Sequence, residues 1–207
     1  MSLLTNWGYL LTESYSLPNM LTTVEYEDFT AGRYASDARI EPNIGAASAA
    51  IRNYCGWHVY PSLACELNGY AYSGRVTRVR GGVQIQLPAK FVTAVESVSI
   101  SGTAYTDFIF ETNGMLKVFG VTEPIYEHTS INIRYTAGVP DELMGSIKEL
   151  IAHRVTHALA SSNGVQSETA GGVSITYSAN WTNSARATAL ADDNKEVLAP
   201  YRIQGVF

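Results

Sequence analysis

The sequence has few of the residues that indicate a secreted or redox-active protein. Only two of its 207 residues are cysteines. Cys55 and Cys65 do not have the C-x-x-C spacing of a zinc or redox site. In a chain that is not secreted, such a pair is more often two reduced, partly buried thiols than a disulfide. We therefore predict two free thiols.

The sequence also lacks any apolar run of the roughly eighteen residues needed to cross a bilayer. Its first residues, MSLLTNWGYLL, carry no basic cluster of the kind that opens a secretory signal. These absences exclude a membrane partner and favour a protein that stays in the compartment where it is made.

Basic residues are outnumbered, with 14 Lys and Arg against 19 Asp and Glu, for a net charge of -5. A nucleic-acid clamp normally presents a basic face, so this balance argues against specific DNA binding. An acidic surface is instead compatible with a protein that DNA passes without being bound. The sequence also has no phosphate loop, G-x-S-x-G elbow or calcium loop, so we expect no catalytic residue and no cofactor.

One stretch, IAHRVTH, places His153 and His157 four residues apart in a predicted helix. Zinc proteases use H-E-x-x-H, in which a glutamate follows the first histidine and acts as general base. Here Arg154 takes that place, and its charge opposes a divalent cation. We therefore predict no metal site and keep a metal-dependent enzyme only as a minor alternative.

Helical periodicity marks both ends of the chain. Thr22 and Glu25 form a capping box that opens a short helix through Phe29, which Gly32 can end. A second helix has Pro42 in its first turn and Gly56 after its end, and a third spans about residues 141–161. The apolar stripes of the second and third helices predict a core made of Ile44, Ala47, Ile51, Tyr54, Leu143, Ile147, Leu150 and Ile151.

Between these ends, the pattern from about residue 70 to 135 changes to short β-rich runs separated by turns. Gly81-Gly82 and Asn113-Gly114 read as hairpin turns. Arg78 and Arg80 fall on one face of a strand, which predicts an exposed edge protected by charge. An alternative function is a carbohydrate-binding or adhesin module, if the candidate tyrosines Tyr70, Tyr72 and Tyr105 line a concave face.

The last residues form a separate segment after Pro200, which must end the preceding helix. This segment is too apolar for a free tail and too short for a core of its own, so we expect it to dock on a partner. Its docking residues are predicted to be Tyr201, Arg202, Ile203, Val206 and Phe207.

Three separated stretches together resemble the head-tail connector, or adaptor, proteins of long-tailed bacteriophages. They are LPNMLTTVEYEDFTAGRYASDARIEPNIGAASAAIRNYCGWHVYP, INIRYTAGVPDEL with its following helix, and GVQSETAGGVSITYS leading to VLAPYR. The resemblance spans most of the chain, and the order and spacing of the three stretches carry it. It implies a structural virion protein that joins the DNA-filled capsid to the tail and lets DNA pass.

The resemblance further implies a ring of generally twelve copies beneath the portal protein, located in the virion neck and assembled in the host cytoplasm. The implied partners are the portal, a tail-side neck, stopper or tail-terminator protein, other copies of the chain, and DNA that is not specifically bound. The implied docking arm would lie in a groove of the portal, where Arg202 could pair with an acidic residue.

We thus predict an α+β fold, namely a small α-helical bundle with an inserted antiparallel β module and an extended C-terminal arm. The expected divisions are residues 1–69, with the first bundle helices; 70–138, the β-rich insert; 139–199, the later helices with a strand-like hairpin; and 200–207, the arm.

Overall fold

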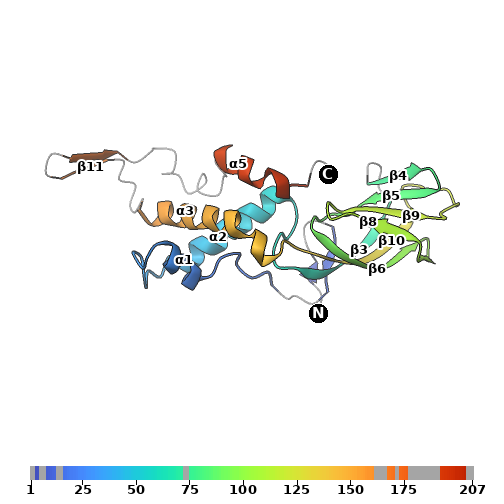
Figure 1. Cartoon of the computed structure of the whole chain (residues 1–207), viewed down its shortest axis with the longest axis horizontal. Helices are drawn as coiled ribbons and strands as arrows, with labels where there is room; N and C mark the ends of the chain where they lie inside the picture. Colours follow the sequence, from blue (N-terminus) through green and yellow to red (C-terminus); the bar gives the residue numbers. More distant parts are fainter. Residues whose placement is uncertain are drawn as a thin grey trace. The chain divides into compact units, whose positions relative to one another are not determined.

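The computed structural model describes residues 3–4, 8–12, 16–71, 75–160, 167–170, 173–176 and 192–203. These residues combine helices with antiparallel sheets, which confirms the predicted α+β class (Figure 1). The chain divides into two compact units. A β-rich unit comprises Met1–Pro18, Cys55–Asp141 and Tyr201–Phe207, and a helical unit comprises Asn19–Tyr54 and Glu142–Pro200.

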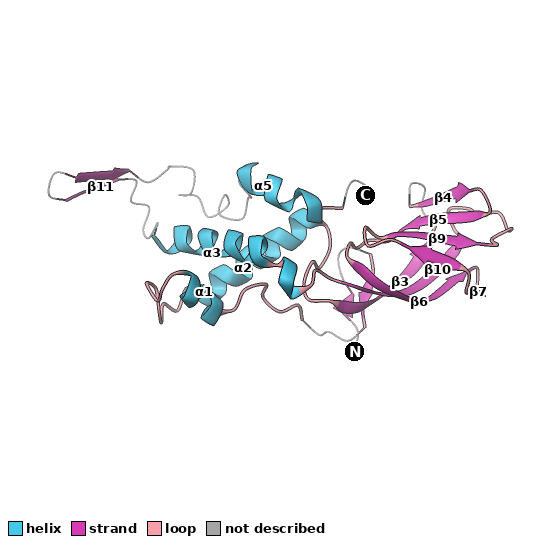
Figure 2. Ribbon diagram, in the orientation of Figure 1, coloured by secondary structure: helices cyan, strands magenta, loops and turns pink. Residues whose placement is uncertain are grey.

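The helices alternate with loops at both ends of the sequence (Figure 2). They are α1 (Thr23–Phe29), α2 (Ile40–Cys55), the 3-10 helix η1 (Asp141–Leu143), α3 (Gly145–Ala160), α5 (Asp192–Leu198) and the 3-10 helix η4 (Ala199–Tyr201). Strands β11 (Ser167–Ala170) and β12 (Val173–Thr176) pair antiparallel with each other. None of the described helices is long and apolar enough to span a membrane.

Local signals set both ends of α1. The predicted capping box is confirmed: Glu25 N donates to Thr22 Oγ1 at 3.2 Å, and Thr22 N donates to Glu25 Oε2 at 2.8 Å. After the helix, Ala31 takes the left-handed conformation with a φ of 50°, and Gly32 N donates to Glu27 O at 2.9 Å. This is the pattern of a Schellman ending, in which Gly32 follows the left-handed residue.

Most of the predicted helical core is buried. The buried members are Ile44, Ala47, Ile51, Ile147, Leu150 and Ile151. Tyr54 is half-buried, and its hydroxyl donates to Lys195 O at 3.5 Å. Leu143 corrects the prediction, because its side chain is 51% exposed. It lies in η1, before α3 begins, and the next residue, Met144, is the one that is buried.

Specific polar contacts also join the helices within their unit. Lys148 Nζ on α3 lies 2.6 Å from Glu25 Oε1 on α1. The Tyr26 hydroxyl lies 3.1 Å from Thr156 Oγ1, so α1 and α3 meet at two points. These contacts fix α1 against α3.

The larger sheet has six strands in the order β1-β2-β3-β10-β6-β7, with every neighbouring pair antiparallel. The strands are β1 (Leu3–Leu4), β2 (Leu10–Leu11), β3 (Leu63–Tyr70), β6 (Val92–Ile100), β7 (Thr103–Tyr105) and β10 (Ser130–Ala137). The β-rich unit therefore recruits the N-terminal segment and residues from Leu63 onward, and it is larger than the 70–138 span expected from the sequence.

The smaller sheet has four antiparallel strands in the order β4-β5-β9-β8. They are β4 (Val76–Val79), β5 (Gly82–Gln86), β8 (Phe108–Phe110) and β9 (Met115–Phe119). The two predicted hairpins are confirmed by the antiparallel pairs β4–β5 and β8–β9, and Gly81 and Gly114 in their turns have positive φ values of 82° and 89°. Gly82, expected in the first turn, is instead the first residue of β5. Alternate residues of the two central strands are fully buried and form the inner face: Val83, Ile85, Leu116 and Val118.

A buried histidine ties the N-terminal segment to the larger sheet. His58 Nε2 lies 2.9 Å from Ala137 O, and its Nδ1 lies 2.7 Å from the Tyr9 hydroxyl. A carbonyl oxygen can only accept, so Nε2 carries the proton and Nδ1 accepts from Tyr9. The Tyr9 hydroxyl in turn accepts from His58 N at 3.0 Å. The pair thus connects the segment before α1 with the end of β10.

Both cysteines are free and buried, as predicted. Burial raises the pKa of Cys55 to about 12, and it raises the pKa of Cys65 to about 12 as well. Because the thiolate is the reactive form, these thiols are chemically inert at neutral pH.

Candidate assembly interfaces

The segment that follows α5 begins on the β-rich unit. Trp57 Nε1 donates to Tyr201 O at 2.6 Å, and Ile203 N donates to Cys55 O at 3.0 Å. The rings of Trp57 and Phe91 stack with centroids 6.4 Å apart, and the ring of Tyr201 stacks on that of Phe91. These contacts anchor the first residues of the C-terminal segment.

The predicted docking residues consequently divide into three groups. Ile203 is only 9% exposed and Tyr201 is half-buried, and both contact the chain's own β-rich unit. Arg202 is exposed. Val206 and Phe207 lie outside the described residues. The sequence after Pro200 indicates apolar side chains that need burial, but it does not tell whether they pack on a partner or on their own chain.

The histidine pair on α3 points to the exposed side of the helix. His153 is 77% exposed in its side chain, and its Nε2 lies 3.6 Å from Glu149 Oε1 one turn earlier. His157 is also exposed, whereas Arg154 between them is buried, and burial lowers the pKa of its guanidinium. Within the described ranges, no three His, Cys, Asp or Glu side chains are grouped so that they could hold a metal ion.

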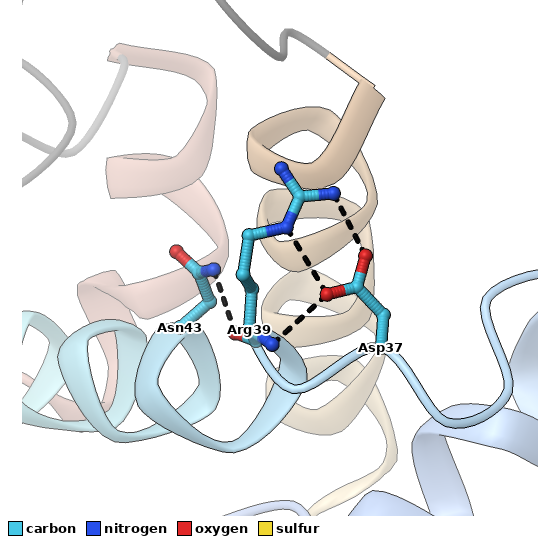
Figure 3. Close-up of polar contacts among 3 residues, drawn as sticks. All are labelled: Asp37, Arg39 and Asn43. Atoms are coloured by element: carbon cyan, nitrogen blue, oxygen red, sulfur yellow. Dashed lines mark hydrogen bonds and ion pairs between the residues drawn. The ribbon is translucent and has the colours of Figure 1, made fainter.

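A charged cluster at the start of α2 was not predicted from the sequence (Figure 3). Asp37 Oδ1 accepts from both Arg39 N at 2.9 Å and Arg39 Nε at 3.0 Å, and Arg39 Nη2 lies 2.7 Å from Asp37 Oδ2. Asn43 Nδ2 donates to Arg39 O at 2.8 Å. Hydrogen bonding from the Arg39 side chain lowers the pKa of Asp37 to about 2. The spacing D-x-R before a helix could have indicated this turn.

Two of the three tyrosines proposed for carbohydrate binding, Tyr70 and Tyr105, lie on opposite faces of the larger sheet. Tyr105 aligns with Val98 across β6 and β7, in the row that continues to buried Ile133 and Leu67. Tyr70 lies three residues beyond Leu67 on β3, so it points to the opposite side of the same sheet. Tyr72 lies outside the described residues. This arrangement does not form a concave aromatic platform from Tyr70 and Tyr105.

Several large apolar side chains remain exposed in the single chain. They are Val24, Phe29, Tyr70, Ile109, Phe110, Tyr126, Leu143 and Val197. They occur in both compact units, and two of them are neighbours on β8. Exposed apolar groups of this size are expected where a chain meets another protein.

Comparisons with known proteins point to a phage structural protein. The family model for the head completion protein matches residues 19–203. No curated protein matches the sequence. Among solved structures, a chain from the neck of the native GTA particle, computed with C12 symmetry, has a TM-score of 0.51 and 18% identity over 95% of this chain and 97% of that chain.

A chain from the neck of the empty GTA particle, computed with C6 symmetry, has a TM-score of 0.48 and 17% identity, with the same coverage of 95% and 97%. The resemblance to head-tail connectors is confirmed by the family match, which takes in parts of both compact units. The chain belongs to the head completion protein family and is a structural protein of the head-tail connector.

Proposed function

We propose that this head completion protein forms a closed ring in the neck of a phage-like particle, beneath the portal. The observation that carries the proposal is the family match across residues 19–203. It is supported by the shared fold with a neck chain from a particle computed with C12 symmetry, which suits a ring of twelve copies.

A ring subunit must present two different surfaces to its neighbours, because a contact repeated around an axis is heterologous. The exposed apolar side chains on both units supply surface for such contacts. We propose that the helices form the small bundle of the connector fold and that the β-rich unit is inserted into it. The chain needs no catalytic group or cofactor for this role, and it is not an enzyme.

The ring has four kinds of partner. Portal protein lies above it, and a stopper, tail-terminator or other tail-side neck protein lies below it. Copies of the same chain lie on either side, and DNA passes through the channel without specific binding. The net charge of -5 supports the last point, since few phosphates would be held. Assembly occurs in the host cytoplasm, without a membrane.

The C-terminal segment is the portal-docking element. Tyr201 and Ile203 anchor it to the β-rich unit, so they set where the docking residues begin. Arg202 is exposed and can pair with an acidic portal residue, which would fix the register of the contact. Val206 and Phe207 supply the apolar part of the contact.

The test is electron microscopy of particles made with and without this chain. Without it, DNA-filled heads should accumulate that lack tails, and supplying the chain should restore the tails. A map of the complete neck should contain a ring of this fold against the portal. A neck map in which every density is accounted for by other chains would overturn the proposal.

A further inference from the structure

The four-stranded sheet has two open edges in the described part of the chain. In the order β4-β5-β9-β8, the first and last strands have a described neighbour on one side only. Strands β4, β5 and β9 run side by side (Figure 2). An open edge presents unpaired backbone groups and can pair with a strand of another chain.

The backbone of β8 shows which of its groups face the open edge. Phe119 N donates to Asp107 O at 2.9 Å, and Glu111 N donates to Met115 O at 2.8 Å. In an antiparallel pair, hydrogen-bonded positions alternate with positions whose N–H and C=O point away from the partner. Residues 107, 109 and 111 therefore bond toward β9, and Phe108 and Phe110 direct their backbone groups outward.

The side chains of β8 lack the protection usual for an edge. Ile109 is 59% exposed and Phe110 is 38% exposed, and no charged residue lies within the strand. Natural edge strands are commonly blocked by charge or proline. The exposed apolar strand therefore favours a protein partner at this edge.

The two edges of this sheet carry opposite charge. β8 is flanked by Asp107 and Glu111, both exposed. β4 contains Arg78 and is followed by Arg80, both exposed, and Arg75 precedes it. The Arg78 guanidinium donates to Val121 O and to Thr122 O at 3.0 Å, which holds this basic edge in place.

The strand directions are also compatible with a junction between copies. Each of the three neighbouring pairs in the sheet is antiparallel, so β8 runs opposite to β4. A β8 edge placed beside the β4 edge of another copy would continue the antiparallel pattern. Such a contact joins two different surfaces and can repeat around an axis.

We propose that β8 of one copy pairs with β4 of a second copy, so that the four-stranded sheets join edge to edge around the ring. This inference rests on the proposed ring and names the contact that holds its β-rich units together. The occupant of the β8 edge is thus a second copy of this chain, with Glu111 on the same face of the joined sheet as Arg75 of the β4 edge.

Paired cysteines test this contact in the full chain. Ile109→Cys and Thr77→Cys place one exposed thiol on each edge, and both positions lie on the same face of the sheet. The natural thiols of Cys55 and Cys65 are buried and do not compete. The double variant and both single variants are assembled with portal rings, treated with a short bifunctional thiol crosslinker that tolerates a shift of one or two residues, and separated under denaturing conditions.

The double variant should give a ladder of covalent oligomers, because each copy offers one thiol to each neighbour. Each single variant should stay monomeric. Reversal of charge at Glu111→Arg should weaken the ladder, and combining it with Arg75→Glu, on the same face of the sheet, should restore it at least in part.

Three results would overturn the edge contact. Dimers from Ile109→Cys alone would mean that β8 pairs with itself. Crosslinks from Ile109→Cys to a portal subunit would identify a different occupant. Rings visible by electron microscopy without any ladder would remove the edge contact while leaving the proposed ring intact. Absence of rings from complete necks would instead defeat the proposed function itself.

Discussion

The ring of Tyr201 stacks on the ring of Phe91, with centroids 5.7 Å apart and planes inclined by 19°. These residues lie 110 positions apart in the sequence, and both belong to the β-rich unit. The contact therefore fastens the segment after the last helix to the same unit as the middle of the chain. Its strength decides how firmly the docking residues beyond it are placed.

Replacing Tyr201 with alanine should lower the free energy of unfolding by about 1–3 kcal/mol, because it removes an aromatic stack and a large part of the buried side-chain surface. Tyr201→Phe keeps the ring and should lose less. Urea denaturation followed by tryptophan fluorescence measures both, since Trp57 lies in the same stack. Equal losses in the two variants would show that the hydroxyl, and not the ring, makes the contact.

Deleting residues 204–207 should leave the anchor at Tyr201 and Ile203 in place. The truncated subunit should fold with the same urea midpoint as the full chain and should lose portal binding at least tenfold. Deleting residues 201–207 removes the anchor as well and should lower stability too. Portal affinity can be measured by biolayer interferometry with immobilised portal rings. Unchanged affinity of the shorter deletion would contradict the docking assignment.

Gly82 lies where β5 passes close to β9, and an added Cβ would collide with the Val118 carbonyl. Gly82→Ala should therefore destabilise the chain by about 2 kcal/mol or more, because the obstacle is backbone and cannot move aside easily. Gly69→Ala is the matched control. Gly69 is also a strand residue, and a Cβ there would meet nothing within 4 Å. Thermal unfolding of the two variants should separate them, and similar melting temperatures would contradict the packing.

The ion pair between Glu25 and Lys148 predicts a small pH dependence of stability. The hydrogen bond from the Lys148 side chain lowers the pKa of Glu25 below its usual value. A group with a lowered folded-state pKa contributes stability above its unfolded-state pKa, and that contribution is lost as pH falls through the folded value. The pair is partly exposed, so its contribution at pH 7 should be under about 1 kcal/mol.

Glu25→Gln tests this pair while keeping an oxygen that can accept from the Thr22 backbone. Urea midpoints of the variant and the natural chain should differ at pH 7 and converge as the pH falls through the lowered pKa of Glu25 and its carboxyl becomes protonated. A difference that persists unchanged at the lower pH would mean that the amide disturbs the helix cap and that the charge contributes nothing.

The double variant His153→Ala and His157→Ala should assemble normally and keep its stability within about 1 kcal/mol, because both side chains are exposed and alanine favours a helix. Zinc analysis of the natural protein gives an independent measurement. Stoichiometric zinc that disappears in the double variant would revive the metal site that the sequence motif suggested.

Local sequence signals predicted the parts of the fold that depend on neighbouring residues. Thr22 and Glu25 are three positions apart, and their capping geometry is set by that spacing alone. Gly81 and Gly114 likewise marked hairpin turns through a conformation that glycine adopts easily. Leu143 shows the limit of periodicity, because one 3-10 turn before α3 shifted the buried position to Met144.

Contacts between distant residues could not be predicted in this way. The pairing of Cys65 with Tyr135 in the larger sheet joins strands separated by most of the β-rich region, and no local pattern specifies that register. The hydrogen bond from Trp57 Nε1 to Tyr201 O also joins residues far apart in the sequence, and no local pattern predicts it. The sequence indicated that the apolar residues after Pro200 would be buried. It did not indicate that some of them would be buried against their own chain.

The division of the chain into units has a consequence for biosynthesis. Each unit is assembled from separate stretches of sequence, and the chain crosses between the two after Pro18, Tyr54, Asp141 and Pro200. A nascent chain cannot complete the helical unit until residues beyond Glu142 have left the ribosome, and the β-rich unit waits for its last piece until after Pro200. Neither unit can be complete before residues up to Pro200 have been translated, so a prematurely terminated chain exposes unpaired strands and helices to aggregation or degradation.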